Sequence, residues 1–156
     1  MDVKYINPFI ESFSSVMPQL GFEKVTIGSL NVKSKEVTES GVIAVVGIVG
    51  DIRGNAVYTM SVEAAKTFAS TMMMGMPVEE LDDMAKSALS ELSNMLTATA
   101  ATNFSNSGIT VDISTPTLLQ GENVSVKLSA DPILCIRLFA DGTPLDLNVS
   151  FEKKQN

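Results

Sequence analysis

The 156-residue sequence contains no histidine, no tryptophan and one cysteine, and these absences exclude several kinds of functional site. Without histidine, the chain cannot build a Ser-His-Asp or Cys-His catalytic system. A single cysteine also leaves too few nitrogen and sulfur ligands for a zinc site. We therefore expect no metal held by this chain and none of the usual nucleophile systems.

Basic residues and long apolar runs are scarce as well. The chain has 11 Lys and Arg against 18 Asp and Glu, and its only small basic cluster is Lys153-Lys154. Because no basic stripe can neutralise phosphates, we expect no nucleic-acid partner. No apolar run is long enough to span a bilayer and the N-terminal residues lack the layout of a signal peptide, so we expect no membrane insertion.

The lone cysteine, Cys135, lies in the apolar run 132–139 and is interpreted as a buried structural thiol. A chain with one cysteine cannot form an internal disulfide, which favours a reducing compartment. Together with the missing signal-peptide layout, this predicts a cytoplasmic protein.

Length and composition indicate one globular domain over residues 1–156. Hydrophobic residues make up 45% of the chain and charged residues 19%, which allows a sizeable core. The spacing of apolar residues predicts helices over 7–18, with Asn7 as the cap, over 61–75, and from about 79 to 106. Dense or alternating apolar residues predict strands over 25–32, 41–50, 55–60, 109–114, 123–129, 133–140 and 145–151.

The order of these segments indicates a weak internal repeat, in which a helix followed by three strands occurs twice. If the repeat is real, the first and third helices are equivalent and lie side by side on one face of a sheet. Glu11 and Ser14 then occupy the places of Glu91 and Asn94. Since the first helix has serine where the carboxamide would be, we expect one working site, on the third helix.

One face of the third helix carries a narrow polar stripe. Ser87, Glu91 and Asn94 are spaced by four and then three residues, which places their side chains in line on one helix face. Ala98 and Ala101 continue the stripe with small side chains, so another macromolecule can approach closely. A solvated polar face is the ordinary interpretation of such a stripe.

A functional interpretation of the stripe is also open. The carboxamide of Asn94 can accept a hydrogen bond from water and hold that water in line with a phosphorus atom. This works only if a partner supplies both the phosphoryl group and the metal. Glu91 can then pair with a lysine or arginine of the partner and fix its orientation.

Two segments next to the stripe are interpreted structurally. The acidic run 79–83 could hold a divalent ion, but carboxylates at a helix start also complement the helix dipole, and we favour a solvated helix start. The methionine-rich segment 72–76 is interpreted as core and helix-end packing. The alternative for this segment is an adaptable docking surface.

The stripe and its surroundings resemble a known family. The pattern Ser87-x-x-x-Glu91-x-x-Asn94, followed by Pro116, is similar to the signature of the CheC/CheX/FliY phosphatases of bacterial chemotaxis. The hairpin 50–60 and the Met-Gly-Met-Pro segment 74–77 resemble the CheX branch of that family. The resemblance covers nearly the whole chain.

The resemblance implies an α+β fold, an antiparallel sheet of about six strands with two long antiparallel helices and a third helix packed on it. It implies that the chain accelerates hydrolysis of the aspartyl phosphate on a CheY-like response regulator. By this similarity, Asn94 orients the attacking water, Glu91 pairs with the regulator's lysine, and the regulator supplies Mg²⁺. We expect Ser87, Ala98 and Ala101 to contact the receiver domain. The CheX branch also implies a homodimer joined through sheet edges.

Two other functions stay open at this point. The chain could be a binding module that docks a receiver domain or a flagellar-switch component without catalysis. It could also be a structural subunit whose strand edges drive assembly, since any exposed edge can pair.

Overall fold

A computed structural model of the chain describes residues 3–33, 36–128 and 130–152. The basic cluster Lys153-Lys154 lies outside these ranges, and so does Ser129, the last residue of the strand expected over 123–129. The helical elements are η1 (Val3–Tyr5), α1 (Asn7–Leu20), α2 (Val62–Met72) and α3 (Asp83–Asn106). The strands are β1 (Val25–Lys33), β2 (Glu36–Gly50), β3 (Arg53–Met60), β4 (Val111–Ile113), β5 (Thr117–Lys127), β6 (Ile133–Ala140) and β7 (Thr143–Glu152).

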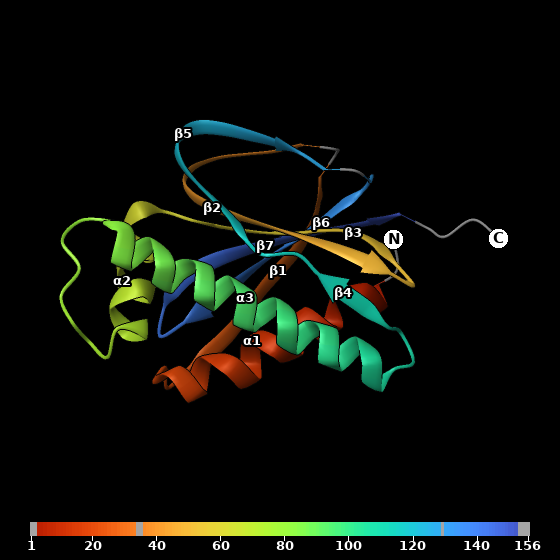
Figure 1. Ribbon diagram of the computed structural model, residues 1–156, viewed down its shortest axis with the longest axis horizontal. Coiled ribbons are helices and arrows are strands. Elements are labelled where there is room, and N and C mark those ends of the chain that lie inside the picture. Colours follow the sequence, from red (N-terminus) through yellow and green to blue (C-terminus); the bar gives the residue numbers. More distant parts are fainter. Residues whose placement is uncertain (1–2, 34–35, 129, 153–156) are drawn as a thin grey trace.

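The strands form one antiparallel sheet in the order β1-β6-β7-β3-β2-β4, with β5 also paired to β2 (Figure 1). The sheet has seven strands, as many as the apolar segments predicted, whereas the resemblance implied about six. β2 is 15 residues long, and its edge away from β3 pairs first with β5 and then, at its end, with β4. The expected α+β class is confirmed.

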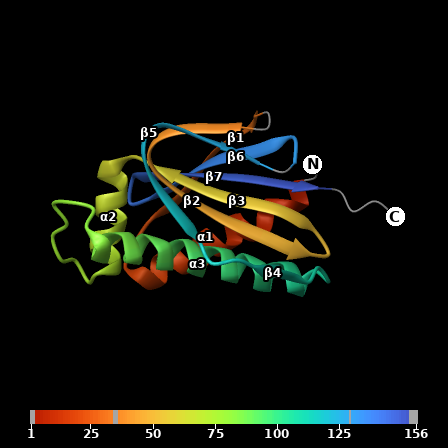
Figure 2. The ribbon, with the colours of Figure 1, turned by 45° about the horizontal axis from the view of Figure 1, so that its top comes forward.

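The helices lie together on one face of the sheet, with α2 at one end of α3 (Figures 1 and 2). α1 and α3 run antiparallel, because the Ser12 hydroxyl donates to Leu96 O at 2.5 Å while the Asn103 amide donates to Pro8 O at 2.9 Å. The main hydrophobic core lies between these helices and the sheet. Within the described ranges, no helix is long and apolar enough to cross a membrane.

The expected internal repeat is visible in the topology. With β5 in place of β4 beside β2, the strand order is β1-β6-β7-β3-β2-β5. Exchanging β1 with β5, β2 with β6 and β3 with β7 gives the same order read from the other end. The turn between β2 and β3 holds Asp51, whose carboxylate accepts a bond from Thr110 N at 2.8 Å. The turn between β6 and β7 holds Asp141, whose carboxylate accepts bonds from Glu23 N at 3.1 Å and Lys24 N at 2.8 Å. Each aspartate therefore ties down the segment that follows the helix of the other half.

The structure corrects the register in which the two helices were matched. Both helices close with equivalent backbone hydrogen bonds, and each closure contains a glycine with positive φ, Gly21 after α1 and Gly108 after α3. Matching these glycines places Glu11 opposite Ala98, about two helical turns beyond Glu91. The expected equivalence with the site residues of α3 is therefore wrong, for Glu11 and equally for Ser14.

The first half lacks a site for a simpler reason than a serine in place of asparagine. In the corrected register Asn7, the first residue of α1, falls opposite Asn94. The turns of α3 that carry Ser87 and Glu91 therefore have no helical counterpart in α1. Ser87 and Glu91 therefore belong to an N-terminal extension that α3 has and α1 lacks, and Asn94 lies at the end of that extension.

The helix starts follow the capping rules in part. The Ser61 hydroxyl accepts a bond from the backbone three residues on, as expected, and the Asp82 carboxylate does the same for α3. α3 consequently begins at Asp83, later than the expected residue 79. Asn7 is not the cap of α1, because Ile6 takes that position without a side-chain bond and Asn7 is already helical.

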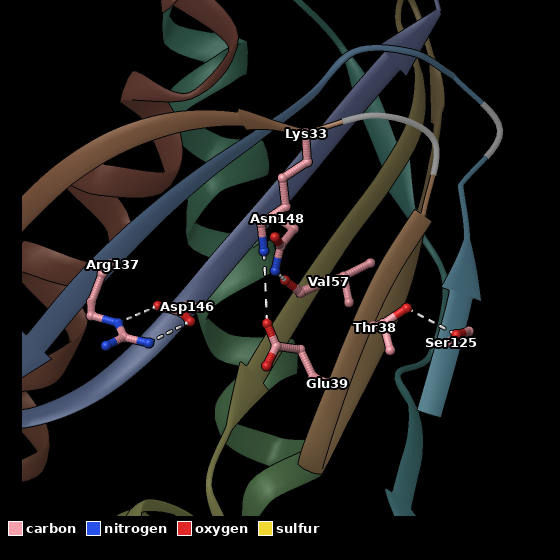
Figure 3. Close-up of polar contacts among 8 residues, drawn as sticks. All are labelled: Lys33, Thr38, Glu39, Val57, Ser125, Arg137, Asp146 and Asn148. Carbon is pink, nitrogen blue, oxygen red and sulfur yellow. Dashed lines mark hydrogen bonds and ion pairs between the residues drawn. The ribbon is translucent and has the colours of Figure 1, made fainter. Parts of the chain in front are cut away.

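The face of the sheet opposite the helices carries cross-strand polar contacts (Figure 3). Arg137 and Asp146 form a two-pronged ion pair with N–O distances of 2.8 and 3.0 Å, and the Lys33 ammonium lies 3.7 Å from the Glu39 carboxylate. The fully buried Asn148 amide of β7 donates to Val57 O of β3 at 3.2 Å. These contacts hold β1, β2, β3, β6 and β7 in place and lie across the sheet from the polar stripe of α3.

Candidate functional site

The polar stripe lies on the N-terminal half of α3. Ser87 and Glu91 are exposed, whereas Asn94 is half-buried rather than fully projecting. Within the described ranges, no hydrogen bond or ion pair engages the Glu91 carboxylate or the Asn94 carboxamide. Both groups therefore keep their full bonding capacity for something outside the chain.

A groove of about 700 Å³ runs along this stripe. One side of the groove is α3, and the other side is the segment that joins β4 to β5, which runs beside α3 in Figure 1. The lining residues are Asp83, Lys86, Ser87, Ser90, Glu91 and Asn94 from α3, and Ile113, Ser114, Thr115, Pro116 and Leu118 from the opposite wall. The stripe is thus one wall of a concave surface rather than a flat solvated face.

The wall opposite α3 is fixed by its own hydrogen bonds. The Ser114 hydroxyl accepts a bond from Gly47 N at 2.8 Å and donates to Thr115 O at 3.2 Å, while Ser114 N donates to Gly47 O at 2.9 Å. Pro116 follows and cannot donate to a strand neighbour, which separates β4 from β5 at this point. The segment consequently leaves the sheet edge beside α3 and closes the groove.

The buried side of α3 is anchored behind the site. The Tyr58 hydroxyl of β3 lies 2.9 Å from the Thr97 hydroxyl, which itself donates to Ser93 O at 2.8 Å. Burial raises the pKa of Tyr58 well above its ordinary value, so the phenol stays protonated. This pair fixes the rotation of α3 about one turn from Asn94 and keeps its carboxamide facing the groove.

The groove gathers some of the predicted residues and leaves others outside. Ser87, Glu91 and Asn94 all line it, as the spacing indicated. Ala98 is exposed and Ala101 half-buried, and both lie further along α3 on the same stripe, beyond the lining residues. The small side chains therefore flank the groove and leave its far end open.

On the α3 wall, the sequence analysis missed the lining residues Lys86 and Ser90. Lys86 and Ser90 stand four residues apart and reach the groove together with Asn94, four residues further on. This second line of side chains converges with the first at Asn94, so spacing alone could have found it. Lys86 adds a positive charge beside the carboxylates of Asp83 and Glu91.

The remaining reactive groups lie elsewhere. Cys135 is 6% exposed and burial raises the pKa of its thiol, which confirms the prediction of a buried, unreactive cysteine. In the part of the chain that the structure describes, no group of three Asp, Glu, Cys or His side chains is placed to hold a metal ion. The chemistry that the groove offers is hydrogen bonding by a carboxamide next to an unpaired carboxylate.

Comparison with known proteins gives one family. The sequence model described as "Chemotaxis phosphatase CheX" matches residues 42–138, a span that includes Glu91, Asn94 and Pro116. The protein named CheY-P phosphatase CheX from Thermotoga maritima is 35% identical over 128 residues, which cover 81% of this chain and 82% of the relative.

Solved structures agree on the fold. A chemotaxis protein CheX from Desulfovibrio desulfuricans is 22% identical, with a TM-score of 0.84 over 96% of this chain and 99% of its own. The CheX chain of a CheX-CheY-BeF3-Mg²⁺ complex from Borrelia burgdorferi is 25% identical, with a TM-score of 0.78 over 97% of this chain and 99% of its own. Both similarities extend over nearly all of the chain.

Proposed function

Because the chain belongs to the CheX family of chemotaxis phosphatases, we propose that it hydrolyses the aspartyl phosphate of a CheY-like response regulator. The observation that carries the proposal is the groove on α3, where an unengaged carboxamide and an unengaged carboxylate stand one turn apart. An aspartyl phosphate is a reactive acyl phosphate, so a modest acceleration by one positioned water is sufficient.

Asn94 is the catalytic residue of this proposal. Its carboxamide oxygen accepts a hydrogen bond from water and aims that water at the phosphorus atom. The new bond joins the water oxygen to phosphorus as the bond from phosphorus to the aspartate oxygen breaks. The products are inorganic phosphate and the regulator's free aspartate, which leaves with the bonding electrons. The half-buried position of Asn94 suits this role, because the groove restricts the rotation of the carboxamide.

Glu91 and Ser87 are proposed to hold the partner in place. Glu91 is exposed one turn before Asn94, where its carboxylate can pair with the lysine of the receiver domain. Ser87 extends this contact along the groove. Ala98 and Ala101 are proposed to let the receiver backbone approach the far end of the stripe.

The proposal assigns Mg²⁺ to the response regulator. The Borrelia burgdorferi relative was solved with CheY, BeF3 and Mg²⁺ in one complex. Magnesium prefers carboxylate and phosphate oxygens, which the phosphorylated receiver itself presents. The proposed location is the cytoplasm, in keeping with the free, buried thiol of Cys135.

A homodimer joined through sheet edges is also proposed. β1 ends the sheet on one side, and it exposes Ile27, Leu30 and Val32 to 46%, 40% and 66%. An unpaired strand edge with apolar side chains favours pairing with a second copy. Sedimentation of the wild-type chain against a Val32→Lys variant tests this assembly, with monomers expected for the variant.

The test of catalysis is phosphate release from a receiver domain charged with acetyl phosphate. We expect the wild-type chain to accelerate release and the Asn94→Ala variant to lose on the order of 100-fold in rate, since a mispositioned water costs about that much. Asn106→Ala, on the exposed end of the same helix, is the matched control and keeps the wild-type rate. Binding of the receiver without accelerated release would show a docking module instead of a phosphatase.

A further inference from the structure

The segment between α2 and α3, together with the first turn of α3, exposes three methionines. Met74 is 96% exposed, Met76 57% and Met84 63%. The expectation that the methionine-rich segment 72–76 packs into the core is therefore wrong for its exposed members. Exposed methionines on this scale are costly for a soluble domain unless something covers them.

Met76 and Met84 line a defined hollow, here named the methionine apex. The hollow measures about 500 Å³ and is lined by Met73, Met76, Pro77, Val78, Glu79, Glu80, Asp82 and Met84, with Met74 exposed nearby in sequence. The segment has a fixed shape, because the Ser70 hydroxyl donates to Met76 O at 2.7 Å and Gly75 N donates to Ser70 O at 2.8 Å. Gly75 sits at a φ of +84°, which suits glycine at this turn.

The methionine apex and the groove that carries Asn94 both draw lining residues from the start of α3. Asp82 and Met84 line the apex, while Asp83 and Ser87 line the groove. Asp82 caps α3, and the other three residues lie in its first two turns, so the two concave surfaces lie close together along the helix. In Figure 1 the loop from α2 to α3 extends past the end of the sheet next to the start of α3. A globular partner seated on Glu91 and Asn94 also reaches the apex.

We propose that the methionine apex is the second contact of the phosphorylated receiver domain, which meets it with an apolar patch edged by lysine or arginine. This inference rests on the proposed function and names the surface that supplies affinity rather than chemistry. Methionine side chains adapt to different apolar surfaces, which makes them effective at docking sites. Glu79, Glu80 and Asp82 line the hollow, and among the described residues no lysine or arginine does, so the complementary surface is basic.

The test separates affinity from turnover with steady-state phosphate release. For the triple variant Met74→Ser, Met76→Ser, Met84→Ser we expect the KM for the phosphorylated receiver to rise about 10-fold while kcat stays at the wild-type value, since the lost apolar contact lies away from the reacting atoms. The control is Val49→Ser with Leu119→Ser, which removes exposed apolar side chains elsewhere and leaves both parameters unchanged.

Each outcome decides the inference separately from the proposed function. If the wild-type chain hydrolyses the phosphorylated receiver and the triple variant keeps its KM, the docking role is overturned and the phosphatase stands. If the triple variant shifts the sedimentation of the chain without changing KM, the apex contacts a second copy, and the inference is again overturned. For a Glu79→Lys, Glu80→Lys variant we expect KM to rise most strongly at low salt, which would support the docking role of the apex.

Discussion

The two halves of the molecule share a plan, but the groove that contains Glu91 and Asn94 is built from the second half. Each half has a helix closed by a glycine with positive φ, and each has an aspartate in a hairpin turn that holds the segment after the other helix. These repeated parts are structural. What differs is the start of the helix, because α3 has 24 residues and α1 has 14. The site therefore arises where one half departs from the repeat.

The edge strands of the two halves also differ, since the edge strand is continuous in the first half and divided in the second. In the first half β1 is one strand that pairs with β6 from Val25 to Lys33, with one irregularity. In the second half Pro116 divides the corresponding stretch into β4 and β5, and the link between them becomes the groove wall. A groove thus required two departures, a longer helix and a broken edge strand.

Reversing the charge at Glu91 on α3, compared with the same change on α1, is expected to give the largest difference in affinity for the receiver. Glu91→Lys places a cation where the partner's lysine is proposed to bind, and we expect affinity for the receiver to fall about 100-fold. Glu11→Lys makes the same change on the exposed face of α1 and is expected to leave affinity unchanged. Calorimetric titration of the receiver measures both. Equal losses in the two variants would show a general charge effect rather than a contact at the groove.

Asp51 and Asp141 allow the two halves to be compared in stability, with smaller expected effects. Asp141 accepts bonds from two backbone amides and Asp51 from one. We expect Asp141→Ala to lower the free energy of unfolding by about 2 kcal/mol and Asp51→Ala by about 1 kcal/mol. Urea denaturation measures both values, and the Asp→Asn variants, which keep an acceptor oxygen, serve as controls. A larger loss of unfolding free energy in Asp51→Ala than in Asp141→Ala would contradict this prediction.

The Tyr58–Thr97 bond is expected to have an effect as small as that of Asp51. Tyr58→Phe removes one buried hydroxyl contact and should cost about 1 kcal/mol in unfolding free energy, whereas Tyr5→Phe should cost less than half of that.

The same tyrosine predicts a dependence of stability on pH. Its pKa is raised in the folded chain above the ordinary 10.0, so the folded state keeps a proton that the unfolded state releases. Stability should therefore be undiminished below pH 10 and fall as the pH rises above it, and Tyr58→Phe should flatten that fall. Identical alkaline slopes in the two proteins would contradict this account.

Local patterns were sufficient to bring the residues of the polar stripe together. Spacings of four and three residues predicted that Ser87, Glu91 and Asn94 share one face, and the groove contains all three. Dense apolar segments likewise predicted the strands β1, β2, β3, β6 and β7, because their burial depends mainly on their own side chains. The sequence could not supply the opposite wall, since its position depends on Ser114 bonding to β2 across a distance of 67 residues.

The errors have physical causes of the same kind. The helices were matched on the recurrence of glutamate, but their true register is set by the helix closures at Gly21 and Gly108, which are backbone features. The methionines of 72–76 were assigned to the core on composition, yet the turn at Gly75 directs the chain outward. In both cases backbone geometry, rather than side-chain type, decided the outcome.

The central claim is that the Asn94 carboxamide acts on the reaction and not on binding. The most direct measurement is kcat for phosphate release at saturating phosphorylated receiver, together with the affinity for the receiver activated by beryllium fluoride. The account predicts that Asn94→Ala lowers kcat on the order of 100-fold with unchanged affinity, while Ser14→Ala on α1 changes neither. A wild-type kcat in the Asn94→Ala variant would contradict it.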